Sequence, residues 1–319
     1  MSYFKQEIIK ITLPTPFAVG DVHAYLLVGD TLTLVDCGTK TEESRNALEA
    51  GLQAEGYSLS DIEQLLITHH HPDHAGGSSF LREEIPYIGH PGNQRWLALE
   101  EAFQQEHDEF FLSLSKTLGV PREYEGFIKY LRSSLRYSGN RTLTSFLNNG
   151  DEVPGHPGWK VIETLGHAQS HISLYRELDG SMVGGDHLLD RISPNPLIEP
   201  PVKPGEERPK SLLQYNASIK ELYQMPISIV YPGHGGNIED VQGIITRNLD
   251  RQHERAMNVK AMLEGKPMSA FEVCIQLFPK VFRKEPGLTL SETVGQLDYL
   301  LDLEAIQPEE TKSGMVYSI

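Results

Sequence analysis

The chain has 319 residues, a hydrophobic fraction of 39% and a formal net charge of −16. This length allows a full core and exceeds the usual size of one domain. The acidic balance argues against nucleic-acid partners, because phosphate backbones repel such a surface. No apolar run is long enough to cross a membrane, and the first residues lack the basic-then-apolar layout of a signal peptide, so we expect a cytoplasmic protein with no membrane partner.

Strand and helix signals alternate along the first ninety residues. Glu7–Leu13, Val22–Val28 and 31–35 are β-rich runs, and 41–55 has a helical pattern. Residues 93–147 are helical and aromatic, and strand signals return at 160–165, 172–175, 181–183 and 227–231. Strands with interspersed helices favour two packed sheets covered by helices. The two cysteines, Cys37 and Cys274, do not indicate a disulfide framework.

Residues 68–74, Thr-His-His-His-Pro-Asp-His, follow an apolar strand-like run and precede a Gly-Gly pair. Imidazole and carboxylate are ligands that Zn²⁺ and similar ions prefer. His69 and His71 point the same way on extended backbone, whereas His70 points away and is left out of the ligand set. Asp73 and His74 follow a turn at Pro72 and can face a second ion. The segment therefore indicates a metal site that needs further ligands from downstream.

Three downstream segments place a histidine or aspartate just after a strand signal and beside glycine. They are Gly166-His167-Ala168-Gln169-Ser170-His171, Gly184-Gly185-Asp186-His187 and Pro232-Gly233-His234-Gly235. Glycine permits the sharp turn that aims a side chain inward. Each segment alone has an ordinary structural explanation, but their order after the first histidine segment is poorly explained by chance.

Together these motifs resemble the metallo-β-lactamase fold superfamily, over roughly residues 5–240. The form is similar to the glyoxalase II-like branch and to the branch of β-lactamase-like protein 2. The resemblance implies an α+β fold, a four-layer αββα sandwich. It implies one metal site from His69, His71 and His167, and a second from Asp73, His74 and His234, with Asp186 bridging. Nitrogen and oxygen ligands fit two divalent ions, with zinc expected and manganese, iron or cobalt left open.

The chain divides, on this interpretation, into a catalytic domain over 1–237 and a helical C-terminal domain over 238–319. Within the first, the insert 93–147 is either a lid over the site or a helical hairpin on the sandwich edge. It carries a basic cluster that would hold an anionic substrate tail or form a solvated face: Lys116, Arg122, Lys129, Arg132, Arg136 and Arg141. The proline-rich loop 191–209 is either a stiff rim of the site or a rigid connection.

The C-terminal residues resemble a small winged-helix-like appendage. Capping boxes predict helix starts at Ser269 and Thr289. The helix expected over 292–304 carries Glu292, Asp298, Asp302 and Glu304 and no lysine or arginine. Four acids would repel phosphates, so we predict no nucleic-acid binding and one of two roles for this unit: packing on the rest of the chain, or dimerisation, which would give a homodimer.

The resemblance implies a metal-bridging hydroxide that attacks a small-molecule substrate. We expect Asp73 to orient this hydroxide, and His187 either to donate a hydrogen bond to the substrate or to orient another ligand. Three functions compete: a hydrolase of small thioesters, esters or lactones; a metal-dependent phosphodiesterase or ribonuclease; and a non-enzymatic regulator with a structural metal. We favour the first, because the acidic balance disfavours polyanions and structural metal sites are usually closed and thiolate-rich.

Overall fold

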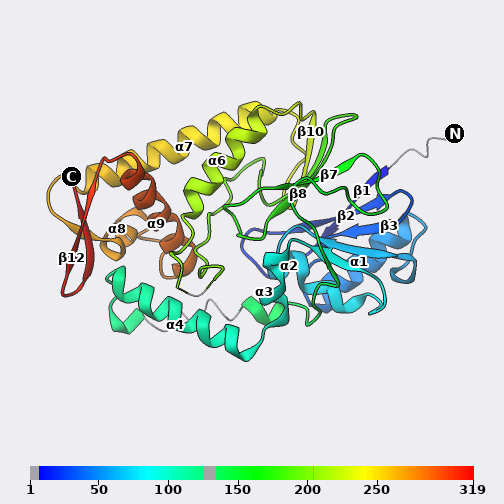
Figure 1. Ribbon diagram of the computed structural model, residues 1–319, viewed down its shortest axis with the longest axis horizontal. Coiled ribbons are helices and arrows are strands. Elements are labelled where there is room, and N and C mark those ends of the chain that lie inside the picture. The colour runs from blue at the N-terminus through cyan, green and yellow to red at the C-terminus, as the bar shows by residue number, and fades with distance from the viewer. Residues whose placement is uncertain (1–6, 125–133, 204) are drawn as a thin grey trace.

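The computed structural model describes residues 7–124, 134–203 and 205–319 (Figure 1). One sheet contains, in spatial order, β1 (Glu7–Leu13), β2 (Val22–Val28), β3 (Leu32–Val35), β4 (Gln64–Ile67), β5 (Tyr87–Gly89) and β6 (Ser145–Phe146). The first three strands pair antiparallel, and β3 to β6 pair parallel. A second sheet contains, in order, β10 (Ile229–Pro232), β9 (Ser181–Gly185), β8 (Ile172–Arg176) and β7 (Trp159–Glu163).

The two sheets face one another across a core that strand alternation explains. On β2, Tyr25 and Leu27 pack in a cluster with Trp159 and Leu174 of the second sheet. The alternate side chains of β2 point the other way, into a cluster that contains residues of helix α1 (Glu42–Ala54). Helix α1 begins at Thr41, whose hydroxyl accepts a hydrogen bond from the Ser44 amide at 3.2 Å.

Helices α6 (Ser211–Tyr223) and α7 (Val241–Met262) cover the outer face of the second sheet. The order helix, sheet, sheet, helix is the αββα sandwich that the sequence predicts. The short elements are α2 (Pro72–Ala75) and the 3₁₀ turns η1 (Leu59–Asp61), η2 (Gly76–Phe80), η3 (Pro91–Asn93), η4 (Arg122–Tyr124) and η5 (Ser134–Tyr137).

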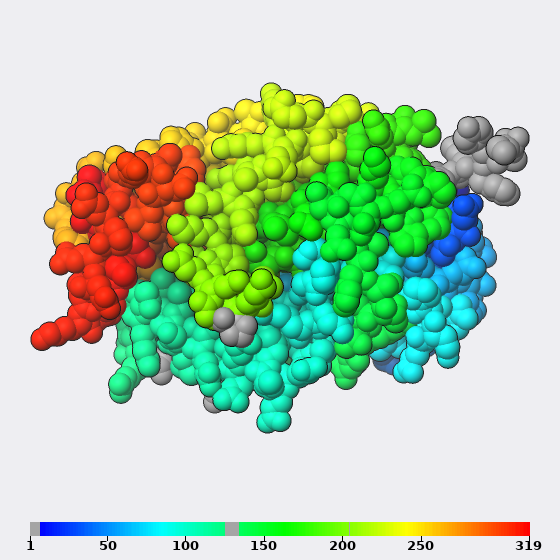
Figure 2. Space-filling model, in the orientation of Figure 1, coloured from blue at the N-terminus to red at the C-terminus, as the bar shows by residue number. Residues whose placement is uncertain are grey.

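The insert contains α3 (Gln94–Ala98) and a longer helix, α4 (Glu101–Thr117). Helix α4 runs along the lower side of the view and reaches the C-terminal elements (Figures 1 and 2). Phe111, Leu118 and Val120 share a buried cluster with Phe271 and Leu290 from the C-terminal part. The insert therefore packs on the C-terminal elements as well as on the sandwich. Lys129 and Arg132 of the predicted basic cluster lie outside the described residues.

The C-terminal elements are β11 (Met268–Ser269), α8 (Ala270–Leu277), α9 (Pro286–Asp302), β12 (Gln307–Thr311) and β13 (Gly314–Ser318). The strands form a small sheet in the order β11, β13, β12. Helix α7 joins this unit to the sandwich along the upper side of Figure 1. Its first half packs with α6 through Ile245, and its second half packs with α8 and α9 through Val259. The boundary predicted near residue 238 is thus followed by one continuous helix that packs on both units.

Of the two capping boxes, the first is confirmed: the Ser269 hydroxyl accepts from the Glu272 amide at 3.2 Å, and the Glu272 carboxylate accepts from the Ser269 amide at 2.8 Å. The second is wrong. Helix α9 already begins at Pro286, because proline at the first position has a backbone angle suited to a helix, and Thr289 lies inside it, donating to the Glu285 carbonyl at 2.8 Å.

Of the four acids predicted on this helix, two form buried ion pairs. Glu292 and Asp298 are buried, and each pairs with an arginine, Arg255 and Arg208 respectively. Burying a carboxylate requires such a partner, which the local sequence of α9 does not contain. Among the residues that the structure describes, no helix is both long and apolar enough to cross a bilayer.

Candidate metal centre

Three histidine nitrogens converge where strands β4 and β7 end. His69 Nε2 lies 2.9 Å from His71 Nδ1, and His167 Nε2 lies 3.0 Å from the same atom. Burial and the neighbouring imidazoles lower the pKa of all three side chains, so they are neutral. Neutral imidazoles whose nitrogens face a common point are suited to binding a divalent cation.

A second group forms beside the first. Asp73 and His74 lie on α2, which Pro72 starts, and His234 follows β10. His234 Nε2 lies 3.4 Å from Asp73 Oδ2, and the ligand atoms of these three residues all lie within 4.8 Å of one another. Nε2 of His74 and Nε2 of His234 are buried without a hydrogen-bond partner. A cation bound here would satisfy both orphaned nitrogens.

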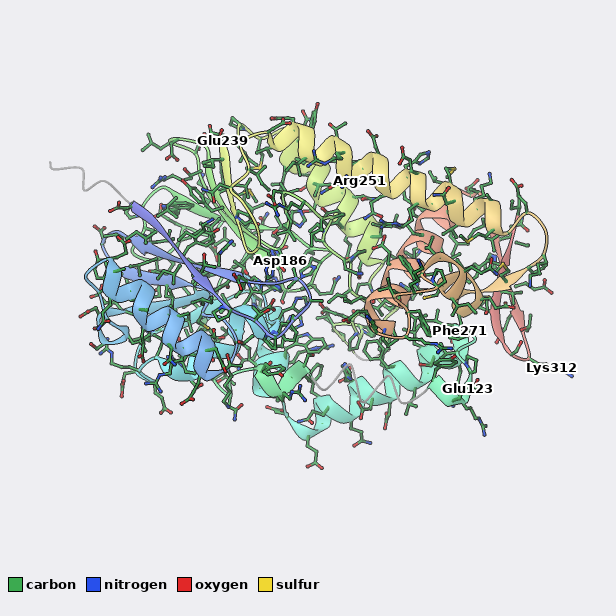
Figure 3. The ribbon with its side chains drawn as sticks, turned by 180° about the vertical axis from the view of Figure 1, so that it is seen from behind. Glu123, Asp186, Glu239, Arg251, Phe271 and Lys312 are labelled. Carbon is green, nitrogen blue, oxygen red and sulfur yellow. The ribbon has the colours of Figure 1, made fainter. Side chains whose placement is uncertain are left out.

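Asp186 lies between the two groups, near the middle of the molecule (Figure 3). Its Oδ2 is 3.6 Å from His167 Nε2 and 3.4 Å from His234 Nε2, while its Oδ1 is 3.3 Å from His74 Nε2. Asp186 can therefore reach an ion in either group. Gly185 makes this possible: its φ is +49°, and an added Cβ would lie 2.7 Å from His171 Nε2.

The electrostatic environment of the second group, Asp73, His74 and His234, favours positive charge. Burial alone would lower the pKa of His234, but Asp186 and Asp73 outweigh it and raise that pKa to about 10. The pKa of His74 is likewise raised well above its usual value, because Asp186, Asp36 and Asp73 outweigh its burial. Each ring therefore holds a proton that a divalent cation would displace.

The rear nitrogens of the histidines are held by hydrogen bonds that leave Nε2 facing the centre. A carbonyl or a carboxylate accepts, so the ring atom Nδ1 carries a hydrogen and Nε2 is the atom that provides the lone pair for an ion when the ring is neutral. The pairs are His74 Nδ1 with Asp36 Oδ2 at 2.7 Å, His167 Nδ1 with the Asn195 carbonyl at 2.9 Å, and His234 Nδ1 with the Asp21 carbonyl at 2.6 Å. His69 Nδ1 lies 3.0 Å from the Thr68 hydroxyl.

Sequence reasoning missed two supporting residues. Asp36 follows β3 and accepts from the amide and the hydroxyl of Thr68, both at 2.8 Å, in addition to His74. His171 Nε2 accepts from the backbone N–H of Asp186 at 3.0 Å. His171 belongs to a motif that the sequence analysis quoted. For Asp36 the available signal was an aspartate and a glycine directly after a strand, the same context that marked Asp186.

Two other histidines lie beside the centre. The Nδ1 atom of His70 lies 2.9 Å from the Ser170 hydroxyl, and its ring stacks on Trp96 with centroids 4.3 Å apart. His70 also forms a further candidate metal group with His71 and Glu199. The structure does not place His187 at the cavity of about 540 Å³ that borders the centre: it is fully buried, and its Nε2 lies 3.0 Å from the Ser218 hydroxyl. Burial lowers the pKa of His187 to about 3, so it is neutral. Its place beside the His171 ring, 5.7 Å between centroids, fits the orienting alternative.

A cavity of about 540 Å³ opens onto both groups. His71, Asp73, His167, Asp186 and His234 line one part of it. The remaining walls come from the loop after β1, from α4, from η5, from the proline-rich loop and from the start of α9. The 93–147 insert and the proline-rich loop thus both border the site.

Of the four described residues of the predicted basic cluster, one lines this cavity and three do not. Arg136 lines it. Arg141 instead donates to the carbonyls of Arg82 and Glu83, at 3.0 and 2.9 Å, and so holds a turn of the sandwich. Lys116 and Arg122 are exposed and do not line the cavity.

Comparison with known proteins agrees with this geometry. The family model described as the metallo-beta-lactamase superfamily matches residues 18–234. A Bacillus subtilis protein named "Probable metallo-hydrolase YqjP" is 46% identical over 301 residues, 94% of each chain. A beta-lactamase-like protein 2 homolog of Caenorhabditis elegans is 23% identical over 83% of this chain and 73% of its own. A crystal structure of a metallo-beta-lactamase family protein from Thermus thermophilus matches with a TM-score of 0.82 and 27% identity, covering 98% of both chains.

The chain therefore belongs to the metallo-beta-lactamase superfamily. It is a metallo-hydrolase with histidine and aspartate clusters able to bind divalent metal ions.

Proposed function

We propose that the protein is a binuclear hydrolase that cleaves a small thioester, ester or lactone. The observation that carries this proposal is Asp186, whose carboxylate lies within 3.6 Å of ligand nitrogens from both groups at the wall of a largely apolar cavity. One carboxylate placed in this way suits two ions that share a ligand. The ligand atoms are nitrogen and oxygen, which fits zinc and also manganese or iron.

Bound divalent ions would supply a Lewis acid for the carbonyl oxygen and lower the pKa of a water molecule towards about 7. The residues supply the rest. His69, His71 and His167 would hold one ion as neutral ligands, and His74 and His234 would hold the other in their neutral form. Asp73 lines the cavity beside His234, and we assign to its carboxylate the orientation of the attacking water.

A carboxylic substrate fits the charges of the cavity better than a nucleic acid does. The chain carries a net charge of −16, and among the described side chains that line the cavity only Arg136 is a lysine or arginine. A phosphodiester backbone is held by several cations, which these lining residues do not contain. One anionic group near Arg136 is compatible with this arrangement.

The test uses the full chain loaded with zinc or manganese and a panel of aryl esters, acyl thioesters, lactones and a phosphodiester. We expect turnover of at least one carboxylic class, loss of activity with a chelator, and recovery when metal is returned. The variant His71→Ala should lose activity, whereas Lys116→Ala, an exposed change away from the cavity, should keep it. Turnover of the phosphodiester with none of any carboxylic substrate would overturn the proposal and favour a phosphodiesterase or ribonuclease.

A further inference from the structure

We propose that one face of α4 and the first turn of α9 together form a binding site for an apolar acyl chain, so that the C-terminal unit takes part in choosing the substrate. The proposal rests on the proposed function and deepens it: it names the substrate class as acyl esters or thioesters with an extended apolar acyl group.

The α4 side of this site is a continuous apolar face. Phe111, Leu114, Ser115 and Leu118 line the cavity, and their spacing places them on one side of the helix. The Ser115 hydroxyl donates to the Phe111 carbonyl at 2.6 Å, so its hydrogen is already used within the helix. From residue 111 to 118 the helix rises by about 10 Å, which gives the cavity an elongated apolar wall.

The opposite side comes from the start of α9. Gly287, Leu288, Leu290 and Ser291 line the same cavity. Leu290 is buried in the cluster that also contains Phe111 and Leu118, whereas Leu288 is 41% exposed. An exposed leucine at a cavity wall is available to contact a ligand, and covering it would remove apolar surface from water.

Two hydrogen bonds hold this turn of α9 against the proline-rich loop. Asn195 Nδ2 donates to the Leu288 carbonyl at 2.9 Å, and the Ile198 amide donates to the Ser291 hydroxyl at 3.2 Å. The same loop accepts the hydrogen bond from His167, through the Asn195 carbonyl. The proline-rich loop therefore fixes the position of the α9 wall relative to the metal ligands. A site that selects acyl chains by their length requires such a fixed position.

The chemistry of the walls selects an apolar group. Besides the leucines, Phe17, Ile192 and Ile198 line the cavity, and Arg136 is the single lysine or arginine among the lining residues that the structure describes. Each methylene buried here should raise kcat/KM about fourfold, which corresponds to the transfer of one CH₂ group out of water at about 0.8 kcal/mol. The rise should stop when the chain reaches the end of the cavity.

The experiment measures kcat/KM of the metal-loaded full chain on a homologous series of acyl thioesters, from acetyl to dodecanoyl. Leu114→Trp and Leu288→Trp narrow the proposed site from its two sides. The matched controls are Leu112→Trp, on α4 but outside the cavity lining, and Leu303→Trp, just after α9, where the leucine is 46% exposed. Thermal unfolding checks that every variant is folded.

We expect the wild-type values to rise with chain length, and we expect both test variants to favour chains at least two carbons shorter than wild type does. Both controls should keep the wild-type profile. A profile independent of chain length, or a Leu288→Trp profile that equals the Leu303→Trp profile, would refute the role of the C-terminal unit.

Binding of decanoate, measured by calorimetry, separates this inference from the proposed function. Wild type should bind decanoate, and Leu288→Trp should bind it at least tenfold more weakly. If no acyl thioester is cleaved but this difference is found, the reaction is misassigned and the acyl site stands. If decanoate binds equally to wild type and to Leu288→Trp, or to neither, the acyl site is refuted.

Discussion

The Asp36 carboxylate accepts a hydrogen bond from His74 Nδ1 at 2.7 Å, with both side chains buried. This contact fixes the ring so that His74 Nε2 faces Asp186. Because the Thr68 amide and hydroxyl donate to the same carboxylate, Asp36 receives three hydrogen bonds and an amide could not accept them all.

The variant Asp36→Asn should therefore bind metal about 10- to 100-fold more weakly, as is usual when the partner of a metal ligand is changed. Competition with a fluorescent chelator measures this affinity. The control Asp302→Asn makes the same chemical change at an exposed position at the end of α9 and should leave the affinity unchanged. An unaltered metal affinity in Asp36→Asn would contradict the orienting role.

The number of metal ions bound per chain should distinguish a variant of the bridging ligand Asp186 from a variant of His234, which belongs to the second group alone. Asp186→Ala removes a carboxylate that reaches both groups and should lower the metal-to-protein ratio from two towards zero. His234→Ala should remove mainly the second ion and leave a ratio near one. Elemental analysis of protein produced with ample metal measures both ratios. A wild-type ratio of one would show that the centre is mononuclear.

The ion pair between Arg208 and Asp298 should stabilise the attachment of α9. Two guanidinium nitrogens each donate to the carboxylate at 2.7 Å, and the Asp298 side chain is only 5% exposed. Arg208→Ala leaves a buried carboxylate unpaired and should lower the free energy of unfolding by about 3 kcal/mol. Arg251→Ala, at an exposed site on α7 labelled in Figure 3, should change it by less than about 0.5 kcal/mol. Chemical denaturation provides both values, and equal effects of the two changes would reject the prediction.

Glu199 should make stability depend on pH. Burial raises the pKa of this carboxyl to about 7 from its usual 4.5, although the Gln169 amide donates to it at 3.0 Å. Between these two values the folded state binds the proton and the unfolded state does not, so stability falls as the pH rises and levels off above about 7. Below about pH 4.5 the Glu199 carboxyl is protonated in both the folded and the unfolded state, so its burial no longer destabilises the folded state through this titration.

The variant Glu199→Gln removes this titration and should become more stable than wild type, by about 2–3 kcal/mol, as the pH rises from 4.5 to 7. Chemical unfolding of both chelator-treated proteins at several pH values measures their free energies of unfolding. Subtracting the wild-type value from that of the variant removes the contribution of all groups that titrate in both proteins. Stability curves that run parallel across this range would disprove the assignment.

The sequence predicted those features that depend on short-range patterns. The spacing of His69, His71, Asp73 and His74 identified a metal-binding segment, and β-rich composition placed β1 and β2 at their observed bounds. Asp36 was missed because its partner His74 lies 38 positions away along the chain, and a strand followed by aspartate is common in turns. The packing of α4 on the C-terminal unit was missed for the same reason: it depends on contacts between segments far apart in sequence.

The start of α9 shows a different limit. A capping box at Thr289 competed with a proline at 286, and the backbone preference of proline decided where the helix begins. The burial of Glu292 and Asp298 depended on arginines from α7 and from the proline-rich loop, which a helix considered alone does not include.

The candidate ligands come from both sheets, His69 to His74 from the end of the first and His167, Asp186 and His234 from the ends of the second. Ions that bind these residues would clamp the two halves of the sandwich together at their shared edge, and the binding free energy would add to the free energy of folding. We therefore expect metal supply to govern not only turnover but also the survival of the chain. In cells short of metal, the metal-free protein would separate more often between its two sheets and would be degraded faster by proteases.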